Sequence, residues 1–153
     1  MKAVIQRVGK TKLSVDGELV SEIEGGLTVF LGVERGDTEE QAREFALKLV
    51  KLRIFADDAG KINLSVADKH LEILLVSQFS LTARIGKGHG NRPDFGNAEI
   101  PERAETIYRL VGKTVNDAGI PVKYGRFGAH MQIDQYNDGP LTVIYESKPQ
   151  EKS

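Results

Sequence analysis

The stretch Leu27-Thr28-Val29-Phe30-Leu31-Gly32-Val33 decides how this chain must be arranged. Read as a strand, it presents apolar side chains on both of its faces, which is typical of a strand in the centre of a sheet. The pair Gly25-Gly26 stands directly before it and marks a turn, because glycine tolerates backbone conformations that other residues avoid. The sequence therefore predicts a buried central strand over residues 27–33.

Further strands are expected on both sides of this one. Asp16-Gly17 is a strong two-residue hairpin signal, and it lies between two β-type runs. The strongly apolar run over residues 71–79 predicts a second buried strand. The remaining strands are expected over residues 2–8, 11–16, 18–24, 53–56, 121–124, 129–135 and 141–146.

Two segments have the apolar spacing of helices. Thr38-Glu39-Glu40-Gln41 matches a capping box, and apolar residues recur at helical spacing from Ala42 to Val50. A second helix is expected from Pro101 to about residue 118, with Gly119 at its end. Many strands with two helices predict an α+β fold with α/β-type layers, built on a mostly antiparallel sheet.

The composition limits the class of protein. The chain has 153 residues with 40% hydrophobic and 28% charged side chains, which fits a single globular domain. We expect this domain to span residues 1–146, followed by a polar tail over 147–153 that frays. The net charge of −1 argues against a protein that coats nucleic acid through a strongly basic surface. No apolar run is long enough for a bilayer, so we expect no membrane partner and a cytoplasmic location.

Several kinds of catalytic site are excluded or have no motif. The chain has no Cys, which removes thiolate nucleophiles and Cys-ligated metals. His70, His89 and His130 form no metal-binding pattern, and no nucleophile elbow, phosphate loop or dinucleotide fingerprint occurs. We therefore expect no metal and no cofactor.

Polar residues close the most hydrophobic strand of the chain. Ser77, Gln78 and Ser80 supply hydrogen-bond donors and acceptors, and Phe79 offers a flat face that could stack on a base. This pattern is typical of the edge of a site, although a strand that simply ends in a loop also has polar residues at its end. Both interpretations stay open on the residues alone.

The segment over residues 84–100 has no periodicity, which is uncommon for so long a stretch in a compact domain. Arg84, Lys87, His89 and Arg92 precede its first acid, Asp94. A small basic patch of this kind suits a few phosphates, and a solvated loop explains it equally well.

The third candidate is Asn137-Asp138-Gly139-Pro140. One interpretation is a hairpin turn with proline at the first position of the next strand. The other starts from the Gly139-Pro140 bond, because an X-Pro bond can be cis at a cost of about 0.5–1 kcal/mol. A cis bond would turn neighbouring carbonyl oxygens to the same side and form a rigid acceptor pair.

Short motifs occur in a fixed order along almost the whole chain, and their joint presence is highly specific. They are Met1-Lys2-Ala3-Val4-Ile5-Gln6-Arg7-Val8, residues 27–33 with Gly36-Asp37-Thr38, Leu52-Arg53-Ile54-Phe55, Gly60-Lys61, residues 77–81, Gly90-Asn91-Arg92-Pro93, Phe127-Gly128-Ala129 and Asn137-Asp138-Gly139-Pro140-Leu141-Thr142. On these motifs the sequence resembles the D-aminoacyl-tRNA deacylases, which are usually called D-tyrosyl-tRNA deacylases.

The resemblance implies a homodimer with its site at the subunit interface, acting on the 3′ end of aminoacyl-tRNA. In this family the residues corresponding to Ser77, Gln78, Phe79 and Ser80 form the catalytic wall. The pair Gly139-Pro140 is cis and reaches across from the partner subunit to select chirality, with Asn137 in the same motif and an arginine, here Arg7, nearby. The resemblance also implies that Phe127 and Met131 pack the terminal adenosine.

The sequence departs from the family pattern at two places. The family's threonine is Ser80 here, which keeps the hydroxyl and loses the methyl that would restrict its rotamer. The loop around Lys87-Gly88-His89-Gly90 is slightly longer than the usual Lys-Gly-Asn-Arg-Pro form, so no phosphate contact is carried over to it.

The resemblance implies an ester hydrolase that releases the D-amino acid from tRNA, accepts glycine and rejects L substrates by exclusion. Two routes stay open for the nucleophile. Either the substrate's 2′-OH assists a water, which the resemblance favours, or Ser80 attacks the ester directly without an identifiable base. Two other functions compete, namely a non-catalytic RNA-binding module and a general esterase for small molecules.

Overall fold

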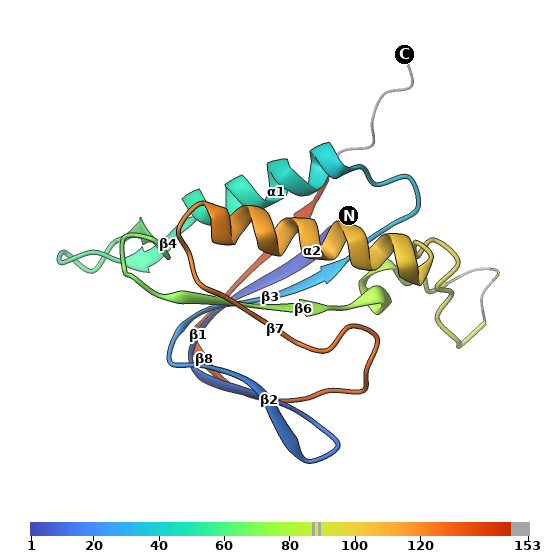
Figure 1. The fold of residues 1–153 in the computed structure, drawn as a ribbon, viewed down its shortest axis with the longest axis horizontal. Coiled ribbons are helices and arrows are strands. Elements are labelled where there is room, and N and C mark those ends of the chain that lie inside the picture. Colours follow the sequence, from blue (N-terminus) through green and yellow to red (C-terminus); the bar gives the residue numbers. More distant parts are fainter. Residues whose placement is uncertain (87, 89, 148–153) are drawn as a thin grey trace.

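Two helices lie side by side on one face of a curled sheet (Figure 1). The computed structural model describes residues 1–86, 88 and 90–147. The helices are α1 (Glu39–Lys51) and α2 (Pro101–Asp117), and a short 3-10 helix, η1, spans Phe79–Thr82. The strands are β1 (Lys2–Val15), β2 (Glu18–Ile23), β3 (Gly26–Gly32), β4 (Arg53–Ala56), β5 (Ile62–Ser65), β6 (Glu72–Ser77), β7 (Val122–Tyr124) and β8 (Gln132–Glu146).

The main sheet is mixed, and its first strand, β1, pairs with three others. Strand β1 pairs antiparallel with β2, β3 and β8, whereas β3 pairs parallel with β6 and β6 pairs parallel with β7. Parallel neighbours need a long crossover connection, and the segments that contain α1 and α2 supply the two crossovers. The predicted α+β fold with two helices and a mostly antiparallel sheet is confirmed.

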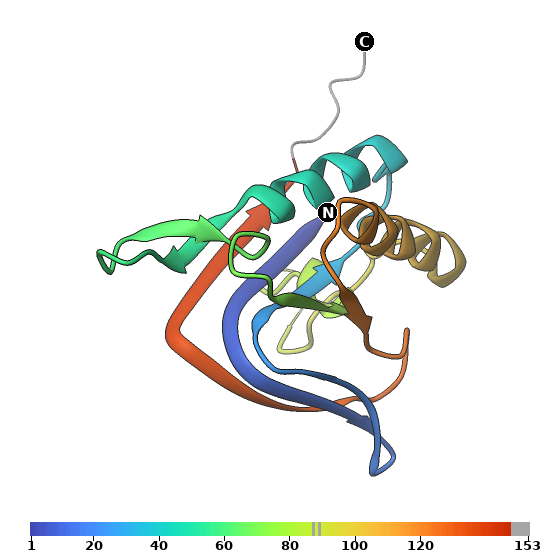
Figure 2. The same cartoon turned by 60° about the vertical axis from the view of Figure 1, so that its left-hand side comes forward.

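The central strand is buried on both faces, as its sequence predicts. Leu27, Val29 and Leu31 on β3 face the helices and pack in one core with Phe45 and Tyr108. A second core lies on the opposite face of the sheet, because the far halves of β1 and β8 curl over it together with β2 (Figure 2). That second core contains Val8, Leu13, Val15, Ile23, Leu74 and Val76.

Both helices begin at the residues that the capping box and the proline predict. The Thr38 hydroxyl accepts a hydrogen bond from the Gln41 amide at 3.2 Å, and the Gln41 side chain accepts one from the Thr38 amide at 2.9 Å. Pro101 occupies the first turn of α2, where the missing N–H costs nothing. No helix in the described part of the chain is long and apolar enough to cross a membrane.

Several predicted boundaries differ from the structure. The two runs over residues 2–8 and 11–16 form one strand, β1, which bulges at Gly9 and Lys10. The second buried strand ends at Ser77 because the chain turns there into η1. Strand β5 was not predicted, and most of the predicted tail lies outside the described residues.

The hairpin interpretation of residues 137–140 is wrong. The chain before and after these residues belongs to one long strand, β8, and both parts pair with β1. Val8 pairs with Asn137 and Gln6 pairs with Thr142, so four residues of β8 lie opposite Arg7 alone. The segment 138–141 is therefore a wide bulge within a continuous strand, where β8 is sharply bent (Figure 2).

The α-amino group of Met1 is held by a buried ion pair. It lies 2.7 Å from one carboxylate oxygen of Asp37, which also accepts a hydrogen bond from the Glu34 amide at 2.7 Å. Asp37→Asn should lower the free energy of unfolding by up to about 3 kcal/mol, because the buried ammonium then keeps only the Glu34 carboxylate, at 3.3 Å, as a counter-charge. Urea unfolding measures this loss, and Asp117→Asn, which removes an exposed pair with Lys113, serves as the control. Equal stability of the two variants would contradict the prediction.

Candidate active site

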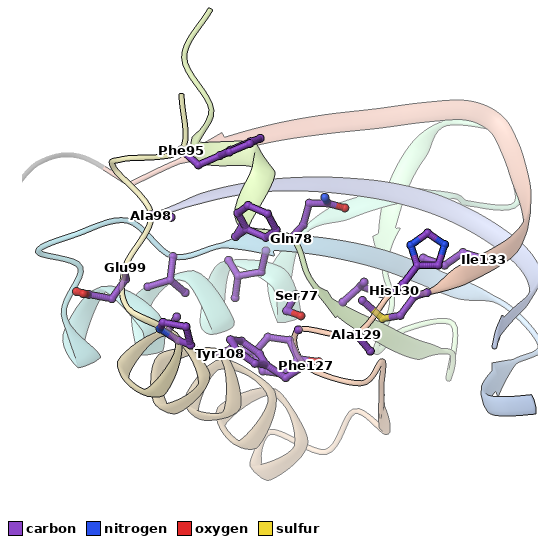
Figure 3. Close-up of a pocket in the computed structure, with 18 residues that line it drawn as sticks. Ser77, Gln78, Phe95, Ala98, Glu99, Tyr108, Phe127, Ala129, His130 and Ile133 are labelled. Atoms are coloured by element: carbon purple, nitrogen blue, oxygen red, sulfur yellow. The ribbon is translucent and has the colours of Figure 1, made fainter. Parts of the chain in front are cut away.

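A cavity of about 640 Å³ opens where β6 ends beside the first turns of α2. Ser77, Gln78 and Phe79 form one side of it, and Phe127 and Met131 form another, so the structure brings these five predicted residues together. Side chains from β6, α2 and the segment before β8 converge on the cavity (Figure 3). Further lining residues are Leu31, Val33, Val76, Phe95, Ala98, Glu99, Pro101, Ala104, Tyr108, Gly128, Ala129, His130 and Ile133.

The turn after β6 fixes the wall for which the resemblance implies a catalytic role. The Gln78 amide donates to the Leu31 carbonyl at 2.8 Å, which ties this turn to the end of the central strand. The approach needs a glycine at position 32, because a Cβ there would lie 2.8 Å from the Gln78 carbonyl oxygen. The Gln78 side-chain amide then donates a short hydrogen bond to the Ser80 hydroxyl. Ser80 does not line the cavity directly, but its position is linked to Gln78, which does.

Two aromatic rings stand at the mouth of the cavity. Phe79 is 61% exposed, and its ring meets the ring of Phe95 edge-on at 5.1 Å between centroids. Phe95 follows directly on a short antiparallel contact between Arg84 and Asp94, which closes the base of the loop. The sequence shows a basic loop here but gives no signal for Phe95. Of the four basic residues predicted to form a patch in this loop, Lys87 and His89 lie outside the described residues.

The adenosine-packing residues predicted from the resemblance form a mainly apolar wall. The Phe127 ring lies 5.6 Å from the Tyr108 ring, and Met131 reaches over Gly125, which has no side chain to block it. The Tyr108 hydroxyl donates to the Leu75 carbonyl at 2.7 Å, and burial raises the pKa of this phenol. Tyr108 therefore stays protonated near neutral pH and acts as a structural donor rather than a base.

Among the described residues, no charged side chain hydrogen-bonds the Ser80 hydroxyl. Glu99 is engaged with Arg103 at 3.3 Å, and its other oxygen accepts from the Ile100 amide at 2.9 Å. In the described part of the chain, the one side chain that hydrogen-bonds Ser80 is Gln78, an amide that cannot remove a proton. The described residues also contain no group of three or more His, Cys, Asp or Glu side chains that could hold a metal ion. The geometry suits binding and orientation of a polar substrate more than direct nucleophilic attack.

The second set of predicted residues lies elsewhere. Gly139 and Pro140 lie on the β8 bulge and Asn137 stands just before it; all three are exposed, and none of them lines the cavity. The Gly139-Pro140 bond is cis. Within one chain the structure therefore separates the bulge from the cavity wall.

Arg7 holds the bulge from the helix side of the sheet. Its Nε donates to the Asp138 carbonyl at 3.0 Å and lies 3.3 Å from the Asp138 carboxylate. Its Nη1 donates to the Ile54 carbonyl on β4 at 2.8 Å, so the guanidinium connects the bulge to a neighbouring strand. Arg7 and the bulge are thus brought together, as the resemblance implies.

Known proteins match this chain almost end to end. A sequence model of the family described as D-Tyr-tRNA(Tyr) deacylase matches residues 4–146. A D-aminoacyl-tRNA deacylase of Magnetococcus marinus is 47% identical over 152 residues, with 99% of each chain covered. A D-aminoacyl-tRNA deacylase of Persephonella marina is 49% identical over 148 residues, with 97% of this chain and 99% of that one covered.

Two solved structures have the same fold as this chain. A structure described as the c-Myc DNA Unwinding Element Binding Protein is 41% identical, with a TM-score of 0.89, and covers 97% of this chain and 100% of its own. A probable eukaryotic D-amino acid tRNA deacylase shares the fold with a TM-score of 0.78 at 17% identity, covering 94% of this chain and 97% of its own. The resemblance seen in the sequence is confirmed, and the chain belongs to the D-Tyr-tRNA(Tyr) deacylase family.

Proposed function

We propose that this protein is an ester hydrolase that removes D-amino acids from tRNA. The observation that carries the proposal is the cavity in which Ser77, Gln78 and Phe79 meet Phe127 and Met131. A cavity with aromatic walls and a polar rim fits the terminal adenosine and its ester, because aromatic rings stack on bases. Charged tRNA is used in the cytoplasm, and we place the activity there.

The hydrolysis is assisted by the substrate's own 2′-OH. Water adds to the ester carbonyl, the bond to the 3′ oxygen breaks, and that oxygen takes up a proton. An aminoacyl ester is already activated, so the enzyme has to orient the reactants and stabilise charge on the carbonyl oxygen. The lack of a base beside Ser80 in the described residues supports this route over attack by Ser80.

Chirality is read by the bulge of a partner subunit in a homodimer. Gly139 and Pro140 are exposed and lie away from the cavity of their own chain, so a second copy is needed to bring them to a substrate. Carbonyl oxygens of this bulge then occupy the space into which an L side chain would project. D substrates and glycine fit the same space, so we expect glycyl-tRNA to be hydrolysed as well.

Deacylation of a matched pair tests the proposed function. The wild-type protein is incubated with D-Tyr-tRNA, with L-Tyr-tRNA and with a small model ester, and release of the acid is measured. We expect turnover of the D-aminoacyl-tRNA alone. Binding of tRNA without turnover would indicate an RNA-binding module instead, and turnover of the model ester would indicate a general esterase.

The Ser80 hydroxyl is expected to orient the substrate rather than to attack it. Ser80→Ala should slow hydrolysis of D-Tyr-tRNA by about tenfold or less, since one hydrogen bond is lost. Ser80→Thr restores the family's residue and serves as the matched control, with activity close to wild type. Loss of all activity in Ser80→Ala, or an acyl group trapped on Ser80, would instead support covalent catalysis.

A further inference from the structure

The β8 bulge is flanked on the two faces of the sheet by neighbouring residues of β1. Successive side chains of a strand point to opposite faces, so Gln6 and Arg7 project on opposite sides of the sheet. Arg7 lies directly opposite the bulge and holds it from the helix side. Gln6 pairs with Thr142 at the C-terminal end of the bulge, on the other face.

A chain of side-chain amides joins the two ends of the bulge on the face of Gln6. The Gln135 amide nitrogen donates to the Gln6 oxygen at 2.8 Å and to the Asn137 oxygen at 2.8 Å. The Gln6 amide nitrogen donates to the Thr142 hydroxyl at 3.3 Å. Asn137 stands just before the bulge and Thr142 just after it, so these contacts hold both ends of the bulge to β1.

The hydrogen bonding of Gln135 does not favour the stability of the fold. The remaining oxygen of Gln135 is buried and has no hydrogen-bond partner among the described residues. A buried acceptor without a donor is unfavourable, and an apolar side chain of similar shape would avoid that cost. The glutamine is therefore better explained by what its nitrogen holds in place than by its contribution to folding.

We infer that Gln6 and Gln135 are positioning residues for chiral selection, an inference that rests on the proposed function. With Arg7 they hold the bulge from both faces, so that its main-chain oxygens enter the partner's site at a fixed place. Loosening the amide chain lets the bulge shift, and discrimination between D and L substrates falls. Neither residue lines the cavity of its own chain, so both act through the bulge.

The test compares Gln135→Met with Gln132→Met. Methionine matches glutamine in length, and Gln132 is an exposed residue of the same strand outside the amide chain. For Gln135→Met we expect unfolding stability close to wild type, because removal of the unpartnered oxygen offsets the loss of the two hydrogen bonds that the Gln135 nitrogen donates. We also expect the ratio of kcat/KM for D-Tyr-tRNA over L-Tyr-tRNA to fall about tenfold, by the sensitivity of reaction rates to small displacements. Gln132→Met should change neither quantity.

A second variant breaks the amide chain at another contact, so that an effect of Gln135→Met on folding can be recognised. Thr142→Val removes the hydroxyl that Gln6 binds and sits at an exposed position. It should also lower the D-over-L ratio while leaving stability unchanged. Wild-type ratios in both Gln135→Met and Thr142→Val would overturn the inference and leave the proposed function intact. A wild-type protein without D-over-L discrimination would overturn the proposed function itself.

Discussion

Gly139→Ala should reduce hydrolysis of D-Tyr-tRNA about 100-fold, because a displaced bulge intrudes on the space that the D substrate occupies in the partner's cavity, and a misplacement of about 1 Å can cost that much in rate. Gly139 has a φ of +132°, a conformation that side chains other than glycine rarely adopt. An added Cβ would also lie 2.9 Å from the Leu141 amide nitrogen and 3.2 Å from the Arg7 guanidinium. The backbone of the bulge must therefore shift, and the Arg7 guanidinium must give way by a few tenths of an ångström.

Gly17→Ala is the matched control for this experiment. Gly17 has a φ of +80° in the turn between β1 and β2, with open space around it, so its substitution strains the backbone away from the bulge. We expect Gly17→Ala to lose some stability and to keep its activity. Single-turnover rates on D-Tyr-tRNA, together with melting temperatures, separate the two effects. A Gly139→Ala protein that hydrolyses D-Tyr-tRNA at the wild-type rate would contradict a role for the bulge.

Removing the 2′-OH of the substrate should slow hydrolysis by at least about 100-fold, the lower end of what a positioned acid–base group contributes. Among the described residues, the side chain that hydrogen-bonds the Ser80 hydroxyl is the Gln78 amide, which cannot take over this task. The substrate is D-Tyr-tRNA that ends in 2′-deoxyadenosine and carries its ester on the 3′ oxygen. The rate under saturating enzyme is compared with that of the normal substrate.

Two controls make the comparison interpretable. Spontaneous hydrolysis of both substrates is measured without enzyme, and the affinity of each for the protein is measured by competition. If both substrates bind equally and only the normal one is cleaved, the hydroxyl takes part in the reaction. Equal cleavage of the two would point to Ser80 as the nucleophile, and the Ser80→Ala variant should then be inactive.

The fold could be predicted from the sequence where the signals are local. The capping box at Thr38, the proline at the start of α2 and the two-faced apolar run of β3 each determine their own element. The parallel pairing of β3 with β6 could not be predicted from any one segment, because it depends on how the crossovers pack. The bulge at residues 138–141 also looks like a hairpin turn in sequence, since Asn-Asp-Gly-Pro is typical of turns and only pairing with β1 shows otherwise.

The sequence predicted the residues of the cavity in part and gave no signal for the amide chain beside the bulge. Polar residues at the end of a buried strand indicated Ser77 and Gln78, while Phe127 and Met131 came from the family resemblance alone. Phe95 and Tyr108 could not be assigned to the cavity, because one lies in an aperiodic loop and the other on an ordinary apolar helix stripe. The amide chain from Gln6 through Gln135 depends on strand register, which a sequence does not reveal.

Pairing two defective copies in one dimer measures most directly whether chirality is read across subunits. One copy carries Gly139→Ala and keeps its cavity, and the other carries Ala98→Trp, which fills its cavity and leaves the bulge intact. Each variant alone should hydrolyse D-Tyr-tRNA at least about 100-fold more slowly than wild type. Co-expression of the two should restore hydrolysis of D-Tyr-tRNA but not of L-Tyr-tRNA, because the mixed dimer joins one intact cavity to one intact bulge. A mixed dimer as inactive as its parents would contradict the account.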